Sequence, residues 1–243
     1  MEPLDFVNGM FSMIFVFLSL FIGILILLKY IKYKERIFLI VSFVWVLIGS
    51  PWWPSSLSFL IALNNNVGLP LESYFTLGNV FVPVAVALWL VAFTEFLYTE
   101  KRKLILLIFV IYGSIFEIIF FILLLIDPNL IGNLNPPVDV SFKSFIMVYL
   151  LSFLLIFVIS GLLFARLSLK SEDPEVRFKG KMLVGAYVTF LIGSVLDSVL
   201  DSSVPISGFI IIFTRLILIL SAFFWYAGFF LPRWIKKLFL KKG

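Results

Sequence analysis

Four ionisable side chains lie within long apolar stretches of this sequence, namely Glu117, Asp197, Asp201 and Arg215. A charge inside such a stretch is costly to bury, so each of these positions is a functional candidate. Asp197 and Asp201 are four residues apart, and a helix therefore places both carboxylates on one face. A guanidinium among carboxylates can form a structural ion pair, or the same groups can meet a small ligand, an ion or a proton. Because three carboxylates accompany one guanidinium, the excess of negative charge favours a binding role, and the structural ion pair remains the alternative.

Other polar side chains occur at a comparable depth in these stretches. Tyr187 and Ser194 share the helical face of Asp197, and Asn79 lies at a similar height in an earlier stretch. The predicted ligand- or ion-binding site comprises Asp197, Arg215, Glu117, Asp201, Asn79, Tyr187 and Ser194. The chain has no His and no Cys, which excludes thiol nucleophiles, His general bases and zinc sites built from either residue. We therefore expect no catalytic residues, no metal site and no cofactor, and we predict that the protein is not an enzyme.

The elements that must position these residues are membrane-spanning helices. The chain has 243 residues, of which 62% are hydrophobic and 14% charged, too apolar for a water-soluble domain. A helix needs about 20 apolar residues to cross a bilayer. Continuous apolar runs of this length cover residues 7–28, 37–63, 74–98, 104–126, 144–166, 182–203 and 206–231. The predicted fold class is an all-α integral membrane protein, with a seven-helix transmembrane domain over 1–231 and a tail over 232–243.

The distribution of basic residues predicts the orientation of the bundle. Of the 19 Lys and Arg residues, all except Lys143 and Arg215 lie in four clusters at 29–36, 101–103, 166–181 and 233–242. With alternating spans these clusters share one side, which the positive-inside rule makes cytoplasmic. We therefore expect an external N-terminus, a cytoplasmic C-terminus and a location in the cell membrane. The net charge of +5 then indicates attraction to an anionic cytoplasmic leaflet and not to nucleic acid.

Prolines and small motifs add detail to the predicted bundle. Pro51 and Pro54 in the second span and Pro83 in the third predict breaks in these helices. Trp52 and Trp53 are expected to belong to an outer interfacial belt, with a cavity wall as the alternative. The string Leu-Ile-Gly-Ser occurs at 47–50 and at 191–194, which would fit a parallel repeat of three plus one plus three spans or a chance match. The tail over 232–243 has the pattern of a basic amphipathic helix or of a simple stop-transfer segment.

Seven spans with this orientation resemble the plan of rhodopsins, G-protein-coupled receptors and the seven-helix sensor modules of prokaryotic signalling proteins. A retinal protein requires a Schiff-base Lys in the seventh span, where this chain has Arg215. Eukaryotic receptors end the third helix with a triplet of an acidic residue, Arg and an aromatic residue, and this chain has TEFLYTEKRK there. Their Asn-Pro-x-x-Tyr motif is missing from the seventh span. The resemblance therefore implies a receptor-like module of the prokaryotic sensor type.

The predicted function is that of a sensor or receptor. A small ligand or ion would bind the polar site in the outer half of the bundle and signal to a cytoplasmic protein partner. A small-solute, ion- or proton-coupled transporter or channel is the first alternative, ranked second because the inner halves of the fifth and seventh spans are almost wholly apolar. A membrane scaffold subunit, in which the ion pair is only structural, is the second alternative.

Overall fold

The computed structural model describes residues 1–135, 137–199 and 207–239. Within these residues, seven helical segments are long and apolar enough to cross a membrane, which agrees with an all-α, multi-pass membrane protein. The helices are α1 (Pro3–Tyr33), α2 (Arg36–Ile48), α3 (Trp53–Asn65), α4 (Leu71–Asn79), α5 (Phe81–Leu97), α6 (Arg102–Ile126), α7 (Ser144–Leu169), α8 (Pro174–Val199), α9 (Ser207–Phe229) and α10 (Arg233–Phe239). The orientation in a membrane and the internal repeat stay predictions.

The second and third spans are each built from two helices, at the positions that the prolines predict. A short 3-10 helix, η1 (Ser50–Trp52), separates α2 from α3 and contains Pro51. Val80 separates α4 from α5, three residues before Pro83. Proline lacks an N–H and cannot complete the helical hydrogen-bond ladder, so both spans change direction in the same half of the bundle.

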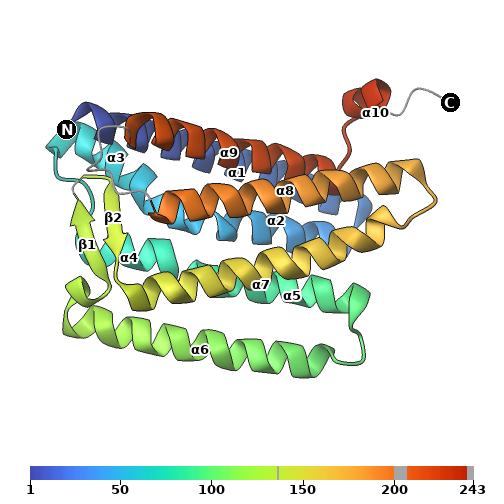
Figure 1. Ribbon diagram of the computed structural model, residues 1–243, viewed down its shortest axis with the longest axis horizontal. Coiled ribbons are helices and arrows are strands. Elements are labelled where there is room, and N and C mark those ends of the chain that lie inside the picture. The colour runs from blue at the N-terminus through green and yellow to red at the C-terminus, as the bar shows by residue number, and fades with distance from the viewer. Residues whose placement is uncertain (136, 200–206, 240–243) are drawn as a thin grey trace.

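The contacts between spans form a closed ring, and α6 lies outside it at one edge of the bundle (Figure 1). Contacts run from α1 to α9, α8, α7, α5 and α2, and then back to α1. The fourth span, α6, lies at the edge of the bundle and packs on α5. Its aromatic side chains also contact Phe153 of α7. Its apolar window is the least buried of the seven. The interior of the ring is therefore formed by the other spans.

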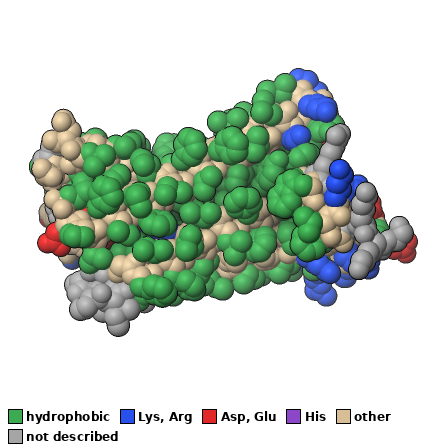
Figure 2. Space-filling view, turned by 90° about the horizontal axis from the view of Figure 1, so that it is seen from above, with side chains coloured by type: hydrophobic (Ala, Val, Ile, Leu, Met, Phe, Trp, Pro, Cys, Tyr) green, Lys and Arg blue, Asp and Glu red, His purple; other side chains and the backbone are tan. Residues whose placement is uncertain are grey.

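A small β-hairpin closes one end of the ring (Figure 1). Strand β1 (Gly132–Asn135) pairs antiparallel with β2 (Asp139–Phe142), with Gly132 opposite Phe142. The segment was expected to be an irregular loop between two spans, so the hairpin was not predicted. We refer to this end as the hairpin end. The opposite end carries the four basic clusters and is called the basic end, and Figure 2 shows the blue Lys and Arg side chains gathered there beyond the hydrophobic belt.

An aromatic layer fills the middle of the ring. It consists of Trp45, Trp89, Phe157, Tyr187 and Trp225, one each from α2, α5, α7, α8 and α9, and all five are at most 1% exposed. The ring centroid of Trp225 lies 4.9 to 6.0 Å from those of the other four. Such offset and tilted arrangements are favourable for aromatic pairs. The layer therefore joins five spans by dense packing.

Candidate functional site

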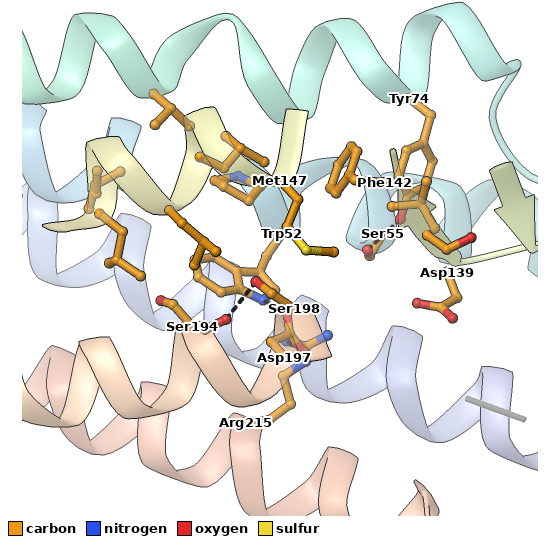
Figure 3. Close-up of a pocket in the computed structure, with 18 of the residues that line it drawn as sticks. Trp52, Ser55, Tyr74, Asp139, Phe142, Met147, Ser194, Asp197, Ser198 and Arg215 are labelled. Carbon is orange, nitrogen blue, oxygen red and sulfur yellow. Dashed lines mark hydrogen bonds and ion pairs between the residues drawn. The ribbon is translucent and has the colours of Figure 1, made fainter. Parts of the chain in front are cut away.

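A cavity of about 290 Å³ lies between the aromatic layer and the hairpin. Figure 3 shows polar and apolar side chains from several elements meeting there. The floor is formed by Phe190, which contacts Trp45 and Phe157 of the aromatic layer at centroid distances of 5.9 Å each. Its lining includes Trp52, Ser55, Tyr74, Asp139, Phe142, Met147, Leu150, Leu151, Leu154, Phe190, Ser194, Asp197, Ser198 and Arg215.

The central feature of the site is a hydrogen-bonded chain of four side chains. Arg215 Nη1 of α9 lies 2.6 Å from Asp197 Oδ1 of α8. The second oxygen of Asp197 accepts a hydrogen bond of 2.8 Å from Trp52 Nε1 in η1. Arg215 Nη2 donates to Asn8 Oδ1 of α1 at 2.9 Å. We call these four residues the polar network, and it connects four separate elements of the ring.

Burial makes the polar network energetically important. The side chain of Arg215 is 5% exposed and that of Asp197 is 29% exposed. A buried guanidinium needs both a counter-charge and hydrogen-bond acceptors, and Asp197 and Asn8 supply them. Asp197 also lines the cavity. The ion pair is therefore buried on the side of Arg215 and open to the cavity on the side of Asp197.

Two polar atoms at the site have no hydrogen-bond partner among the described residues. They are Ser194 Oγ and Arg215 Nε, and both residues line the cavity. Ser194 is 9% exposed and Arg215 4% exposed. Buried polar groups without a partner are uncommon in folded proteins. These two atoms therefore give the cavity one donor and one group that can donate or accept.

The hairpin is held over the cavity by a second set of polar contacts. Tyr74 of α4 donates its hydroxyl to the backbone oxygen of Val138 at 2.8 Å and is 2.7 Å from Ser55 Oγ of α3. Ser58 of α3 donates to the backbone oxygen of Pro137. These bonds fix the turn of the hairpin to α3 and α4. They also bring Asp139, the first residue of β2, to the lining of the cavity (Figure 3).

Gly68 is required where the hairpin meets the preceding loop. Its φ of 85° lies in the left-handed region, and a Cβ there would be 2.8 Å from the backbone oxygen of Pro137. Both observations favour glycine, which has no side chain and accepts positive φ. The loop can therefore pass directly beneath the hairpin turn.

The structure brings together part of the site predicted from the sequence. Asp197, Arg215 and Ser194 line the cavity, and Arg215 pairs with Asp197 as expected. Glu117 does not share this ion pair, because α6 lies outside the ring and Glu117 is not among the residues that line the cavity. Both of its carboxylate oxygens are buried and have no partner among the described residues. The expectation that Glu117 joins Arg215 was therefore wrong.

Three further residues of the predicted site lie elsewhere. Asn79 is at the junction of α4 and α5, where Nδ2 donates to the backbone oxygen of Phe75 at 2.8 Å, and it does not line the cavity. Tyr187 belongs to the aromatic layer, one helical turn below Phe190. Asp201 lies outside the described residues. Residues on one face of α8 thus lie at different heights along the bundle. Ser194 and Asp197 line the cavity, whereas Tyr187 packs in the aromatic layer.

Trp52 has a different role from the one expected. It is 4% exposed, lines the cavity and binds Asp197, so the alternative of a cavity wall holds and the interfacial belt does not. Asn8 is not among the predicted site residues, yet its side-chain oxygen accepts a hydrogen bond from Arg215. Asp139 was missed because its segment was treated as a loop. The alternation of Leu134, Val140 and Phe142 around Pro136 and Pro137 is the signal that could have indicated a hairpin.

Comparisons with known proteins do not assign the chain to a family. No family model matches it, and no curated protein matches it in sequence. In the part of the chain that the structure describes, no group of three or more acidic side chains is placed to hold a metal ion. The interpretation of the site therefore depends on its geometry and charge.

Proposed function

We propose that this protein is a receptor-like membrane sensor whose cavity at the hairpin end binds a small ligand. The observation that carries the proposal is that three members of the polar network, Trp52, Asp197 and Arg215, line the cavity. Through Asn8, which binds Arg215 behind them, the network connects α1, η1, α8 and α9. A ligand that contacts Asp197 or Arg215 competes directly with bonds that hold these elements together. Binding would then shift the relative positions of the spans.

The route from the cavity to the basic end runs through packed side chains. Phe190 contacts the cavity on one side and the aromatic layer on the other. The break at η1 places Trp52 within a span that is interrupted, and such a break can accommodate a change of angle between α2 and α3. Under the predicted orientation, movement of α2, α5 and α9 would change the cytoplasmic surface that a protein partner binds.

The aromatic layer argues against a continuous transport path. Its five aromatic side chains come from five spans, and each of these residues is at most 1% exposed. The layer therefore fills the middle of the ring. A transporter or channel would need polar or small residues at this level for its substrate to pass. We therefore rank sensing above transport, and uptake of solute by proteoliposomes that is lost in Asp197→Asn would reverse that order.

A cysteine reporter at the basic end tests the proposed coupling. The chain has no native Cys, so Thr94→Cys introduces a single thiol on α5, at a position that is 0% exposed and beyond the aromatic layer. Asp197→Asn weakens the polar network and should increase the rate at which maleimide labels this thiol in detergent or nanodiscs. For a coupling free energy of typical size we expect an increase on the order of 5- to 150-fold.

Ser198→Ala in the same Thr94→Cys background is the matched control, because Ser198 lines the cavity but does not belong to the polar network. It should leave the labelling rate unchanged. Equal labelling of folded Asp197→Asn and control proteins would show that the polar network is structural only, which is the scaffold alternative.

A further inference from the structure

The charged residues around the cavity favour a positively charged ligand. Arg215 is neutralised by Asp197 at 2.6 Å, and Asp139 adds a second carboxylate to the lining. Counted as ionised groups, the described lining residues therefore have a net negative charge. An anionic ligand that reached Arg215 Nε would share the cavity with the carboxylates of Asp139 and Asp197, which repel it. A cation is attracted by both carboxylates, and the guanidinium charge that opposes it is already compensated by Asp197.

The whole hairpin end has the same sign. Its described acidic residues outside the polar network are Glu2, Asp5, Glu72, Asp127 and Asp139, and the basic side chain among them is Lys143. In Figure 2 this end shows red acidic side chains, whereas at the opposite end acidic and basic side chains occur together. A field of one sign around an opening raises the local concentration of ligands of the opposite sign. The hairpin end would thus attract cations before they reach the cavity.

The walls of the cavity supply the chemistry that an organic cation needs. Aromatic faces attract cations and also contact apolar groups, and the aromatic lining residues are Trp52, Tyr74, Phe142 and Phe190. On α7, Met147, Leu150, Leu151 and Leu154 add an apolar wall. Ser194 Oγ, buried and without a partner among the described residues, is an acceptor for an N–H group.

We propose that the ligand of this cavity is a small organic ammonium, that is, a protonated amine with an apolar or aromatic body. This inference depends on the proposed sensing function and names the class of ligand for the same site. The ammonium would lie between the carboxylates of Asp139 and Asp197 and donate to Ser194, while its apolar body would contact α7 and the aromatic walls.

The charge preference can be measured without knowing the natural ligand. Ser198→Cys places a single thiol at the cavity lining, and Asn133→Cys places one on the exposed face of β1 as a matched control outside the cavity. Each purified variant is treated with cationic trimethylammonioethyl methanethiosulfonate and with anionic sulfonatoethyl methanethiosulfonate. After normalisation to a free thiol, the cationic reagent should modify Ser198→Cys about tenfold or more faster than the anionic one, as expected for electrostatic attraction.

Two further measurements make the test specific. Asp139→Asn should reduce this preference at Ser198→Cys, and phenethylammonium should protect the thiol while phenethyl alcohol and phenylpropionate should not. Equal rates for both reagents, faster reaction of the anionic one, or equal protection by the alcohol would overturn the ammonium assignment. Because Thr94→Cys reports coupling separately, cation preference without coupling would contradict only the sensing function, and coupling without cation preference would contradict only the ligand class.

Discussion

Arg215 illustrates how a single charged residue can organise a membrane bundle. Its guanidinium is held by an ionised partner on α8 and a neutral amide on α1. The arrangement compensates the cost of burying the charge, and removal of one member leaves another without its partner. The stability of the protein should therefore depend more on completeness of the polar network than on any single bond.

Arg215→Met should lower the free energy of unfolding by at most about 3–5 kcal/mol, the cost of an uncompensated buried charge, because Asp197 loses its counter-ion but is 29% exposed. The double variant Arg215→Met with Asp197→Leu should recover a large part of this loss, since both charges are then removed. Unfolding in detergent, followed by near-ultraviolet circular dichroism, measures both values. A double variant that is less stable than Arg215→Met would contradict this explanation.

Trp52→Phe keeps an aromatic ring in the cavity wall but removes the indole N–H that binds Asp197. A hydrogen bond to a charged group contributes about 1.5–3 kcal/mol, so we expect a loss of that size in the same unfolding assay. Trp53→Phe is the matched control, since Trp53 packs on Phe81 at a centroid distance of 5.3 Å and does not line the cavity. Equal losses for the two variants would assign the effect to ring packing.

The sequence predicts the pairing of Arg215 with Asp197 because charges at similar depth on consecutive spans must compensate each other. It does not predict Asn8, whose partner is 207 positions away along the chain and whose residue type also suits helix packing. Glu117 could not be separated from the site by depth alone. Its exclusion follows from the lateral position of α6, which no residue spacing encodes.

Among the elements, α7 and α8 approach each other closely at Gly161. A Cβ added to Gly161 would overlap the ring of Tyr187 in the aromatic layer. By contrast, a Cβ at Gly113 of α6 would lie 3.4 Å from Pro83 Cβ, which is ordinary van der Waals contact. The first position has no room for a methyl group and the second has enough.

Gly161→Ala should therefore destabilise the protein by about 1–3 kcal/mol, as is typical of overpacked cores. Gly113→Ala should have little effect or a small stabilising one. Thermal unfolding in the same detergent compares the two, and the fluorescence of Trp89 and Trp225 should shift in Gly161→Ala if the aromatic layer is disturbed. A neutral Gly161→Ala would mean that α7 and α8 are less tightly packed than the structure shows.

The broken spans could be predicted at the level of elements, and the hairpin could not. A proline removes a backbone donor wherever it occurs, so Pro51 and Pro83 indicate breaks without knowledge of their neighbours. The strands β1 and β2 have four residues each, so the alternation of Leu134, Val140 and Phe142 is too short to distinguish a hairpin from a loop by itself. Their stability comes from Ser58 and Tyr74, which belong to distant helices.

At the scale of the whole molecule, the orientation can be tested with the same background free of cysteine. Asn133→Cys lies in the hairpin and Lys170→Cys at the turn between α7 and α8. On intact cells, an impermeant maleimide should label Asn133→Cys and should label Lys170→Cys only after permeabilisation, because positively charged loops remain in the cytoplasm. The reverse pattern would place the cavity on the cytoplasmic side.

The number of spans follows from the sequence because the thickness of a bilayer sets the length of each apolar run. Their arrangement around the ring does not, since lipid-facing and protein-facing sides are both apolar and the hydrophobic pattern does not distinguish them. Polar side chains such as Asn8 and Arg215 are the exceptions that mark an inward face.

The contact between α1 and α9 has a consequence for biogenesis. The contact of α1 with the last span forms late, because Asn8 can bind the guanidinium only after Arg215 has left the ribosome and entered the bilayer. Until then, Asn8 and Asp197 have no guanidinium to bind, and the ring stays open on one side. Closure of the chamber therefore depends on the last span, and a chain interrupted before α9 would lack both the guanidinium and the contacts that join α8 to α1.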